Sequence, residues 1–308
     1  QGPTLSLKDR GTALCVLKAL ESGRRTVCLS SSGNNAASVS AYASRAGLEA
    51  VVFVQKHVSP AKIFKSLIYG GRVVRVDGDM AAASRLCSEM VTRRGWFQCG
   101  GPNPYRIAGK RTFAYGIVQQ LGRAPDTVLI PCGGGAGLVA AYDGFRELVA
   151  AGIIERLPRL VGVQLAACDP TARAFREGRD TVTLVDKKPS LSDAIMNNNP
   201  YWGRYCLEAV RASGGTMISV SDADFLRTIR ELGREEGLFT EPAGCVSVAA
   251  LRHLVEMPGF EDPGLTVCNL TGHGLNVPHV AADENEIPGL VVPAVEAVEA
   301  FLRGAGAC

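Results

Sequence analysis

The stretch that decides the fold is Thr127-Val128-Leu129-Ile130-Pro131-Cys132-Gly133-Gly134-Gly135-Ala136-Gly137. It begins with a short aliphatic run, passes through a turn with four glycines in five positions, and continues into a helical pattern over residues 137–151. A strand that runs through a glycine-rich turn into a helix is typical of parallel sheets with crossover helices. The stretch therefore predicts an α/β protein.

The same alternation extends along the chain in both directions. Further strands are predicted at residues 26–29, 50–54, 72–76, 160–164 and 265–269. Further helices are predicted at residues 9–21, 36–46, 61–69, 80–94, 110–120 and 222–236. Apolar runs of strand length, separated by helical patterns, are typical of parallel sheets that are covered on both faces. We therefore expect helices on both sides of each sheet.

Length and charge limit the classes of function. The chain has 308 residues, so we expect one large domain or two closely packed domains. Its formal net charge is +3 and its basic residues are dispersed, which argues against a nucleic-acid partner. No apolar run approaches the roughly 20 residues that a membrane-spanning helix needs. The opening Gln1-Gly2-Pro3 resembles the interior of a domain, so we expect an N-terminal portion to be missing.

Ten cysteines are scattered along the chain, and none belongs to a Cys-x-x-Cys pair. Most lie in apolar surroundings, as in Val27-Cys28-Leu29. This distribution predicts neither a disulfide framework nor a metal site. We expect buried free thiols in a reducing compartment, the cytoplasm.

The glycine turn is the first candidate binding site. Gly133, Gly134, Gly135, Ala136 and Gly137 could wrap a phosphate with backbone N–H groups at the start of a helix. No Gly-Lys-Ser/Thr follows, and the Gly-x-Gly-x-x-Gly spacing of dinucleotide sites is not met. Packing alone rarely requires so many glycines. The turn therefore favours a phosphate site that is neither a P-loop nor a dinucleotide-binding motif.

A second turn of this kind is Ser31-Ser32-Gly33-Asn34-Asn35, between a predicted strand and a predicted helix. Small polar residues and a glycine leave N–H groups unpaired at a helix N-terminus, where an anion such as a substrate carboxylate is stabilised. An ordinary helix cap is the alternative, although a cap needs only one of these five residues.

Lys8 lies in Ser6-Leu7-Lys8-Asp9-Arg10-Gly11, at the start of the first predicted helix. Apolar Leu5 and Leu7 beside it favour partial burial, which lowers the pKa of a lysine and suits Schiff-base formation with an aldehyde. A solvated lysine in the first turn of a helix is the alternative.

Three polar residues elsewhere in the chain could complete a site. Arg106, in Asn103-Pro104-Tyr105-Arg106, could bind a phosphate or carboxylate through two hydrogen bonds. Thr271, in Leu270-Thr271-Gly272-His273-Gly274, could donate a hydrogen bond to an unprotonated ring nitrogen. A structural role in the turn and a catalytic role both remain open for His273.

Six segments, in this order, resemble those of threonine synthases, which are pyridoxal-phosphate enzymes with the tryptophan synthase β-like fold. They are Ser6 to Gly11, Ser32-Gly33-Asn34, Asn103 to Arg106, Gly133 to Gly137, Glu241-Pro242-Ala243 and Leu270 to Gly274. The likeness runs from Pro3 to about Pro278. It implies two open, twisted, mostly parallel sheets covered by helices, and pyridoxal 5'-phosphate as cofactor.

The resemblance also implies a role for each candidate residue. Lys8 would form the Schiff base and move protons, Asn34 would bond the ring hydroxyl, and Thr271 would bond the ring nitrogen. Residues 133–137 would hold the cofactor phosphate. The substrate α-carboxylate would lie on Ser32, Gly33, Asn34 and Asn35, while Arg106 and Ser31 would face the leaving phosphate.

Several departures from the family pattern fall at the distal end of the substrate. Asn35 replaces the usual threonine, Gly100-Gly101 replaces a polar pair, and Gly134 and Gly137 replace asparagines. The resemblance implies elimination of phosphate from an amino-acid phosphoester, O-phosphohomoserine, followed by addition of water. Replacement on O-phosphoserine with sulfite, as in cysteate synthase, and a serine or threonine dehydratase reaction are the alternatives.

The resemblance finally implies two domains around the cofactor. The larger, cofactor-binding domain would comprise residues 1–22 and 100–308, and the smaller, carboxylate-binding domain residues 23–99. The expected partners are a small amino-acid phosphoester and, as in relatives, a second copy in a homodimer.

Overall fold

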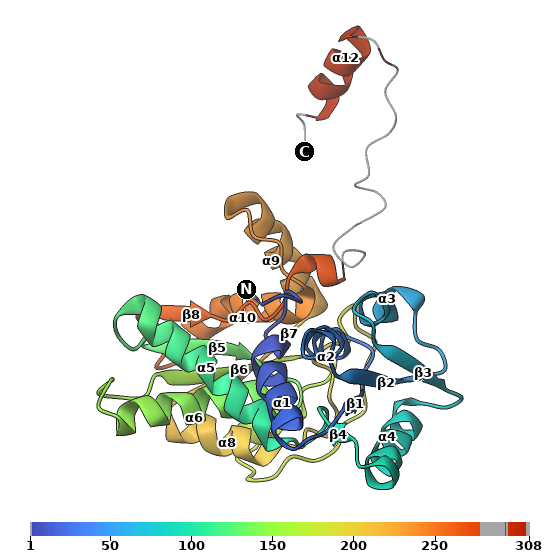
Figure 1. Ribbon diagram of the computed structural model, residues 1–308. Helices are drawn as coiled ribbons and strands as arrows, with labels where there is room; N and C mark the ends of the chain where they lie inside the picture. Colours follow the sequence, from blue (N-terminus) through green and yellow to red (C-terminus); the bar gives the residue numbers. More distant parts are fainter. Residues whose placement is uncertain (1, 278–292, 294, 306–308) are drawn as a thin grey trace.

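The computed structural model describes residues 2–277, 293 and 295–305, which contain two four-stranded sheets. The strand orders are β3-β2-β1-β4 and β7-β6-β5-β8, and all neighbouring strands are parallel. The strands are β1 (Thr26–Ser30), β2 (Glu49–Gln55), β3 (Arg72–Val76), β4 (Phe97–Gln98), β5 (Thr127–Pro131), β6 (Arg159–Leu165), β7 (Thr216–Val220) and β8 (Thr266–Cys268). The predicted α/β class with two parallel sheets is confirmed (Figure 1).

Helices cover both faces of the first sheet. They are α1 (Lys8–Glu21), α2 (Asn34–Arg45), α3 (Pro60–Ile68) and α4 (Met80–Arg94). Successive residues of β1 point to opposite faces, as the pleat of a strand requires. Val27 and Leu29 pack into a cluster with residues of α1 and α2, whereas Cys28 packs against Cys87 of α4. This two-sided burial explains the continuous apolar runs of β1 and β2.

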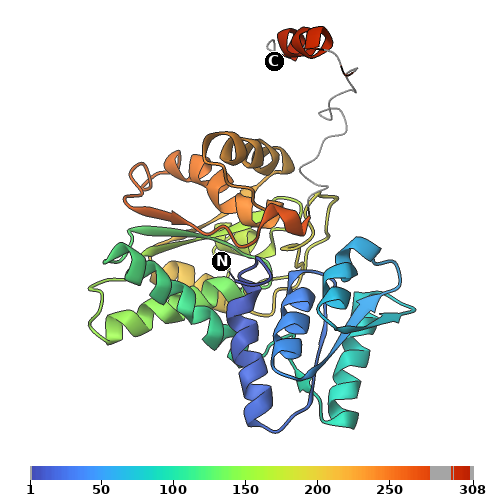
Figure 2. The same ribbon diagram turned by 45° about the horizontal axis from the view of Figure 1, so that its top comes forward.

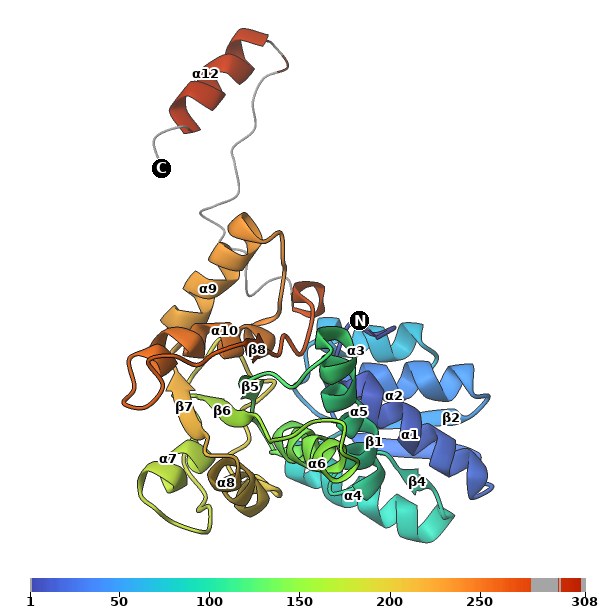
Figure 3. The ribbon, with the colours of Figure 1, turned by 90° about the vertical axis from the view of Figure 1, so that its left-hand side faces the viewer.

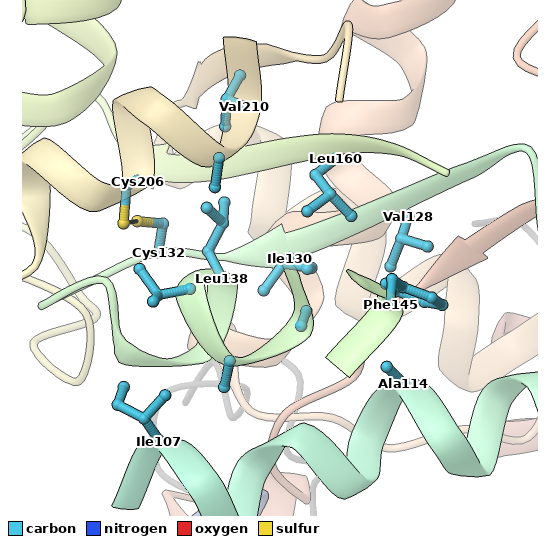
Figure 4. Close-up of a cluster of buried hydrophobic side chains, with 14 of the residues drawn as sticks. Ile107, Ala114, Val128, Ile130, Cys132, Leu138, Phe145, Leu160, Cys206 and Val210 are labelled. Carbon is cyan, nitrogen blue, oxygen red and sulfur yellow. Dashed lines mark hydrogen bonds between the residues drawn. The ribbon is translucent and has the colours of Figure 1, made fainter. Parts of the chain in front are cut away.

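The second sheet is covered in the same way. Its helices are α5 (Pro104–Leu121), α6 (Ala136–Ala150), α7 (Pro170–Arg176), α8 (Gly203–Ala212), α9 (Asp222–Glu235) and α10 (Pro242–Val255). Val128 and Ile130 pack with residues of α5, α6 and α8, as Figure 4 shows, and Leu129 packs with residues of α9 and α10. The glycine turn after β5 is therefore anchored in a core on both faces of its strand.

The predicted elements are present, with differences at their ends. The helix predicted at 110–120 begins six residues earlier, at Pro104, because Asn103 caps it and proline is favoured in the first turn. Strands β4 and β7 and helices α7, α8 and α10 were not predicted. After Leu270, the described residues add the short 3₁₀ helix η1 (Gly274–Asn276) and α12 (Val295–Ala305). No helix in the described part of the chain is long and apolar enough to cross a membrane.

The elements around the two sheets form neighbouring groups, side by side in Figure 2, and α12 stands apart from both. They meet where α1 lies beside α5, as Figure 3 shows. Glycines make this crossing tight. A Cβ at Gly11 would lie 2.9 Å from the Arg106 carbonyl oxygen, and one at Gly109 would lie 2.3 Å from the Arg10 carbonyl oxygen. Gly11 thus has a packing role in the segment that carries Lys8.

Gly109→Ala is expected to lower the free energy of unfolding by about 1–3 kcal/mol, because the added methyl group meets rigid backbone and forces α1 and α5 apart. Gly116→Ala, in the same helix, is the matched control, since its Cβ would meet only the end of the Arg10 side chain at 3.7 Å. That variant should be unchanged or more stable by up to about 1 kcal/mol. Urea unfolding of both variants checks this, and equal stabilities would contradict it.

Candidate functional site

One cavity of about 620 Å³ lies at the carboxyl ends of both sheets. Parallel strands end at a common edge, so the turns after β1 and β5 and the loop after β8 converge there. Every residue predicted for the site lines this cavity: Lys8, Ser31, Ser32, Gly33, Asn34, Asn35, Arg106, Gly133, Gly134, Gly135, Ala136, Gly137 and Thr271. The structure thus brings together residues that lie up to 263 positions apart, from Lys8 to Thr271.

The glycine turn wraps closely against the segment before α8. Gly135 has φ +91°, and a Cβ there would lie 2.6 Å from the Cys206 sulfur, so only glycine fits. A Cβ at Gly133 would lie 3.0 Å from the Ile195 Cα atom, and Trp202 donates a backbone hydrogen bond to the Gly134 carbonyl. No side chain caps α6, which leaves N–H groups of its first turn available to an anion.

The turn after β1 presents a second helix N-terminus to the cavity. Helix α2 begins at Asn34, and Gly33 precedes it without a capping side chain. The N–H groups of this first turn and the helix dipole favour a negative charge. An ordinary side-chain cap, the alternative considered for this turn, is absent from this described helix end.

Lys8 is partly buried at the first position of α1 and lines the cavity. Burial lowers the pKa of Lys8, Arg106 lowers it further, and Glu241 opposes both effects. Its neighbour Asp9 is buried and accepts hydrogen bonds from the Thr4 hydroxyl and the Ser38 hydroxyl, each at 2.6 Å. Asp9 thereby ties the segment that carries Lys8 to α2.

Asn34 is held by a carboxylate that the sequence reasoning did not assign to the site. Its Nδ2 donates to both oxygens of Glu241, at 3.0 and 2.7 Å. Glu241 is only 4% exposed, precedes α10, and donates a backbone hydrogen bond to Gly272. Burial raises the pKa of Glu241, while Asn34 and Lys8 act in the opposite direction. The carboxylate therefore orients one predicted cofactor ligand and stabilises charge on Lys8.

Of the remaining candidate residues, Thr271 and Arg106 lie in the cavity wall and His273 does not. Among the described residues, the Thr271 hydroxyl forms one hydrogen bond, which it donates to the Ala243 carbonyl at 3.4 Å. Arg106 lies in the first turn of α5 and donates to the Gly101 carbonyl at 2.9 Å. His273 does not line the cavity; its Nδ1 accepts from the Leu275 amide, which is the structural role considered above.

Four lysines and an asparagine in the cavity wall were also missed. They are Lys62, Lys65, Lys110, Lys187 and Asn276. Lys62 forms an ion pair with Asp193, and Lys65 donates to the Asn276 side chain, so both connect α3 to the second group of elements. Only Lys110 had a sequence signal, its position four residues after Arg106 on one helix.

The residues present fit pyridoxal 5'-phosphate. The glycine turn and the uncapped start of α6 offer N–H groups to a phosphate. Lys8 offers an amine with a lowered pKa, and Thr271 offers a hydroxyl with one hydrogen bond among the described residues. The volume lies within the roughly 300–1,000 Å³ usual for small-molecule sites.

Comparison with known proteins gives relatives along nearly the whole chain. Residues 1–272 match the family model described as pyridoxal-phosphate dependent enzyme. The chain is 34% identical to a threonine synthase of Methanosarcina acetivorans over 304 residues, 98% of this chain and 75% of that protein. It is 36% identical to a threonine synthase of Synechocystis over 299 residues, 96% of this chain and 76% of that protein.

Solved structures support the fold. Maize serine racemase has a TM-score of 0.79 at 16% identity and is matched over 99% of this chain and 86% of its own. A fungal L-serine ammonia-lyase from Rhizomucor miehei has a TM-score of 0.75 at 19% identity, over 88% of this chain and 85% of its own. The family model and the sequence relatives show that the chain belongs to the threonine synthase family of pyridoxal-phosphate dependent enzymes.

Proposed function

We propose that this enzyme converts O-phosphohomoserine and water into threonine and inorganic phosphate. The observation that carries the proposal is the joint placement of Lys8, two helix N-termini and Arg106 around one cavity. When bound, pyridoxal phosphate supplies an aldehyde for an amine and a ring that withdraws electrons from the substrate α-carbon.

The residues of the chain bind the substrate and transfer protons. The start of α2 binds the substrate α-carboxylate, and Ser31 and Arg106 lie toward the leaving phosphate. The Lys8 amine moves protons at the carbon atoms of the substrate, and its lowered pKa favours the unprotonated form that can accept them. Protons leave the α- and β-carbons, phosphate leaves the γ-carbon, and a proton is added at the γ-carbon. The hydroxyl group of water is then added at the β-carbon, and the α-carbon regains a proton.

The distal end of the cavity supports a second candidate, replacement on O-phosphoserine with sulfite. Gly101 lines the cavity without offering a side-chain donor, and Gly100 beside it packs against Leu29, where a Cβ would lie 3.1 Å from the Leu29 Cβ atom. This reshaped end fits a substrate that places its phosphate differently from phosphohomoserine.

Phosphate release and product identity discriminate between these reactions. The holoenzyme is incubated with O-phosphohomoserine or with O-phosphoserine, with and without sulfite, and products are separated by chromatography. We expect threonine and phosphate in equal amounts from phosphohomoserine. Phosphate from phosphoserine alone, with cysteate when sulfite is present, would reject the first reaction in favour of the second. Ammonia and a keto acid from free serine or threonine would indicate a dehydratase.

We also propose that residues 1–22 with 100–308, and residues 23–99, act as two domains that close over the substrate and exclude bulk water. The contacts of Lys62 with Asp193 and of Lys65 with Asn276 support such a closed state. A homodimer and a cytoplasmic location complete the proposal. The nine described cysteines, all free thiols, support a reducing compartment.

A further inference from the structure

The buried side chain of Lys110 has no counter-ion in the described part of the chain. Its residue is 4% exposed, and it lines the cavity from α5. Among the described residues, no side chain or carbonyl group forms a hydrogen bond or ion pair with its ammonium group. Its neighbour Arg106 differs, because the Arg106 guanidinium already donates to the Gly101 carbonyl. Lys110 is therefore the cation of the pair that lacks a partner.

The crossing of α1 and α5 fixes where this cation lies. Lys8 and Gly11 are three residues apart on α1, and Arg106 and Lys110 are four apart on α5, so each pair shares a helix face. The Cε atom of Lys110 would be 3.4 Å from a Cβ at Gly11. The side chain thus runs over the Gly11 backbone toward the cavity that Lys8 also lines.

The cavity carries more positive than negative charge. Its described lining contains the cations Lys8, Lys62, Lys65, Arg106, Lys110 and Lys187 and the carboxylates Asp193 and Glu241. Asp193 pairs with Lys62, and Glu241 is bonded to Asn34. In the proposed function the cofactor phosphate would lie at the start of α6 and the substrate carboxylate at the start of α2, so neither would neutralise the cations on α5.

Leaving a buried ammonium ion uncompensated is costly, so it either loses its proton or meets an anion. Burial lowers the pKa of Lys110 well below its usual range, and Arg106 and Lys8 lower it further, with Cys15 opposing. A doubly charged anion beside the amine would restore the charged form. A singly charged or neutral group in the same place would stabilise the protonated form of Lys110 less.

We propose that Lys110 determines specificity by binding, together with Arg106, a doubly charged oxyanion at the distal end of the cavity. The inference rests on the proposed function, in which this oxyanion is the leaving phosphate of the substrate. Because Gly101 lines the cavity without a side-chain donor, the two α5 cations are the selective element, and substrates with a free hydroxyl group in place of phosphate are rejected.

The test measures binding of inorganic phosphate to the holoenzyme, after borohydride reduction has fixed the cofactor so that its own phosphate site stays filled. Equilibrium dialysis compares the wild type with Lys110→Gln, Lys110→Arg and the control Lys188→Gln, an exposed lysine outside the cavity lining. Loss of a charge-assisted contact should weaken binding about 10-fold or more in Lys110→Gln, with about 3-fold or less in Lys110→Arg. Lys188→Gln should match the wild type.

Turnover gives a second, independent readout. In Lys110→Gln the KM for the phosphoester should rise more than kcat falls, and Lys110→Met should behave likewise if the glutamine variant does not fold. Phosphate affinity unchanged in the folded neutral variants, or no phosphate binding by the wild type, would overturn the inference. Lys110-dependent phosphate binding without turnover of phosphohomoserine would instead reject the proposed function and leave the inference standing.

Discussion

Lys8→Ala is expected to abolish turnover, lowering kcat by a factor on the order of 10⁴ or more, since one change removes both the covalent attachment point and the proton carrier. The physical basis is the position of Lys8 at the first turn of α1, where burial and Arg106 lower the pKa of its amine. Lys110 also lines the cavity, but it belongs to α5, whereas the predicted attachment point is on α1.

The measurement uses absorbance as well as activity. Wild-type holoenzyme should show the visible band of a lysine-bound cofactor, and borohydride reduction should place the cofactor on the peptide that contains Lys8. The alanine variant should lose the band and the label. Lys18→Ala is the control, because Lys18 lies on the same helix and pairs with Glu21. Label on another lysine, or a variant that retains the visible band, would refute the assignment.

Much of the fold could be predicted because both sheets are buried on both faces. Consecutive side chains such as Val128, Leu129 and Ile130 enter cores on opposite faces of the sheet, so all of them must be apolar. The resulting apolar runs can be recognised in the sequence as strands. The glycine turn could also be recognised in the sequence. Gly135 adopts a positive φ and lies against Cys206, so its position requires glycine. Shorter elements were harder to predict. Strand β4 has only two residues, and it is defined by its pairing with β1, which is a tertiary contact.

The charged residues of the cavity wall were harder to predict, because only contacts between distant segments bring them together there. The start of α5 was placed at residue 110 although Asn103-Pro104 marks a helix N-terminus, and this hid the shared face of Arg106 and Lys110. Lys65 is similar. Its contact with Asn276 joins residues 211 positions apart, and no local pattern of either segment indicates it.

Glu241 shows the same limit in another form. The sequence displays a glutamate before a proline at the start of a helix, which is an ordinary pattern for a helix N-terminus. Only the fold reveals that its carboxylate accepts both Nδ2 hydrogen bonds of Asn34, 207 positions away. A Cβ at Gly272 would lie 2.2 Å from Glu241 Oε1, so the loop after β8 confines the carboxylate to this position.

Glu241→Gln is therefore expected to lower kcat by a factor on the order of 10², with little change in the unfolding temperature because the side chains have the same shape. A glutamine amide offers Asn34 one acceptor and one donor in place of two acceptors, so one of the two hydrogen bonds becomes a donor–donor contact. The substitution also removes the carboxylate that raises the pKa of Lys8. Glu208→Gln is the control, because Glu208 forms an exposed ion pair with Arg204 on α8.

A double-variant cycle separates orientation of Asn34 from the electrostatic effect on Lys8. If Glu241 acts mainly by holding Asn34, then Asn34→Ala combined with Glu241→Gln should lose no more kcat than the worse single variant. If it acts mainly through the charge on Lys8, the two losses should multiply, and the pH at which half of the activity is reached should shift in Glu241→Gln alone. A kcat within about 3-fold of the wild type in Glu241→Gln would exclude both roles. Whichever of the two roles is found, Glu241, which was not among the predicted ligands, would control how Lys8 or Asn34 interacts with the cofactor.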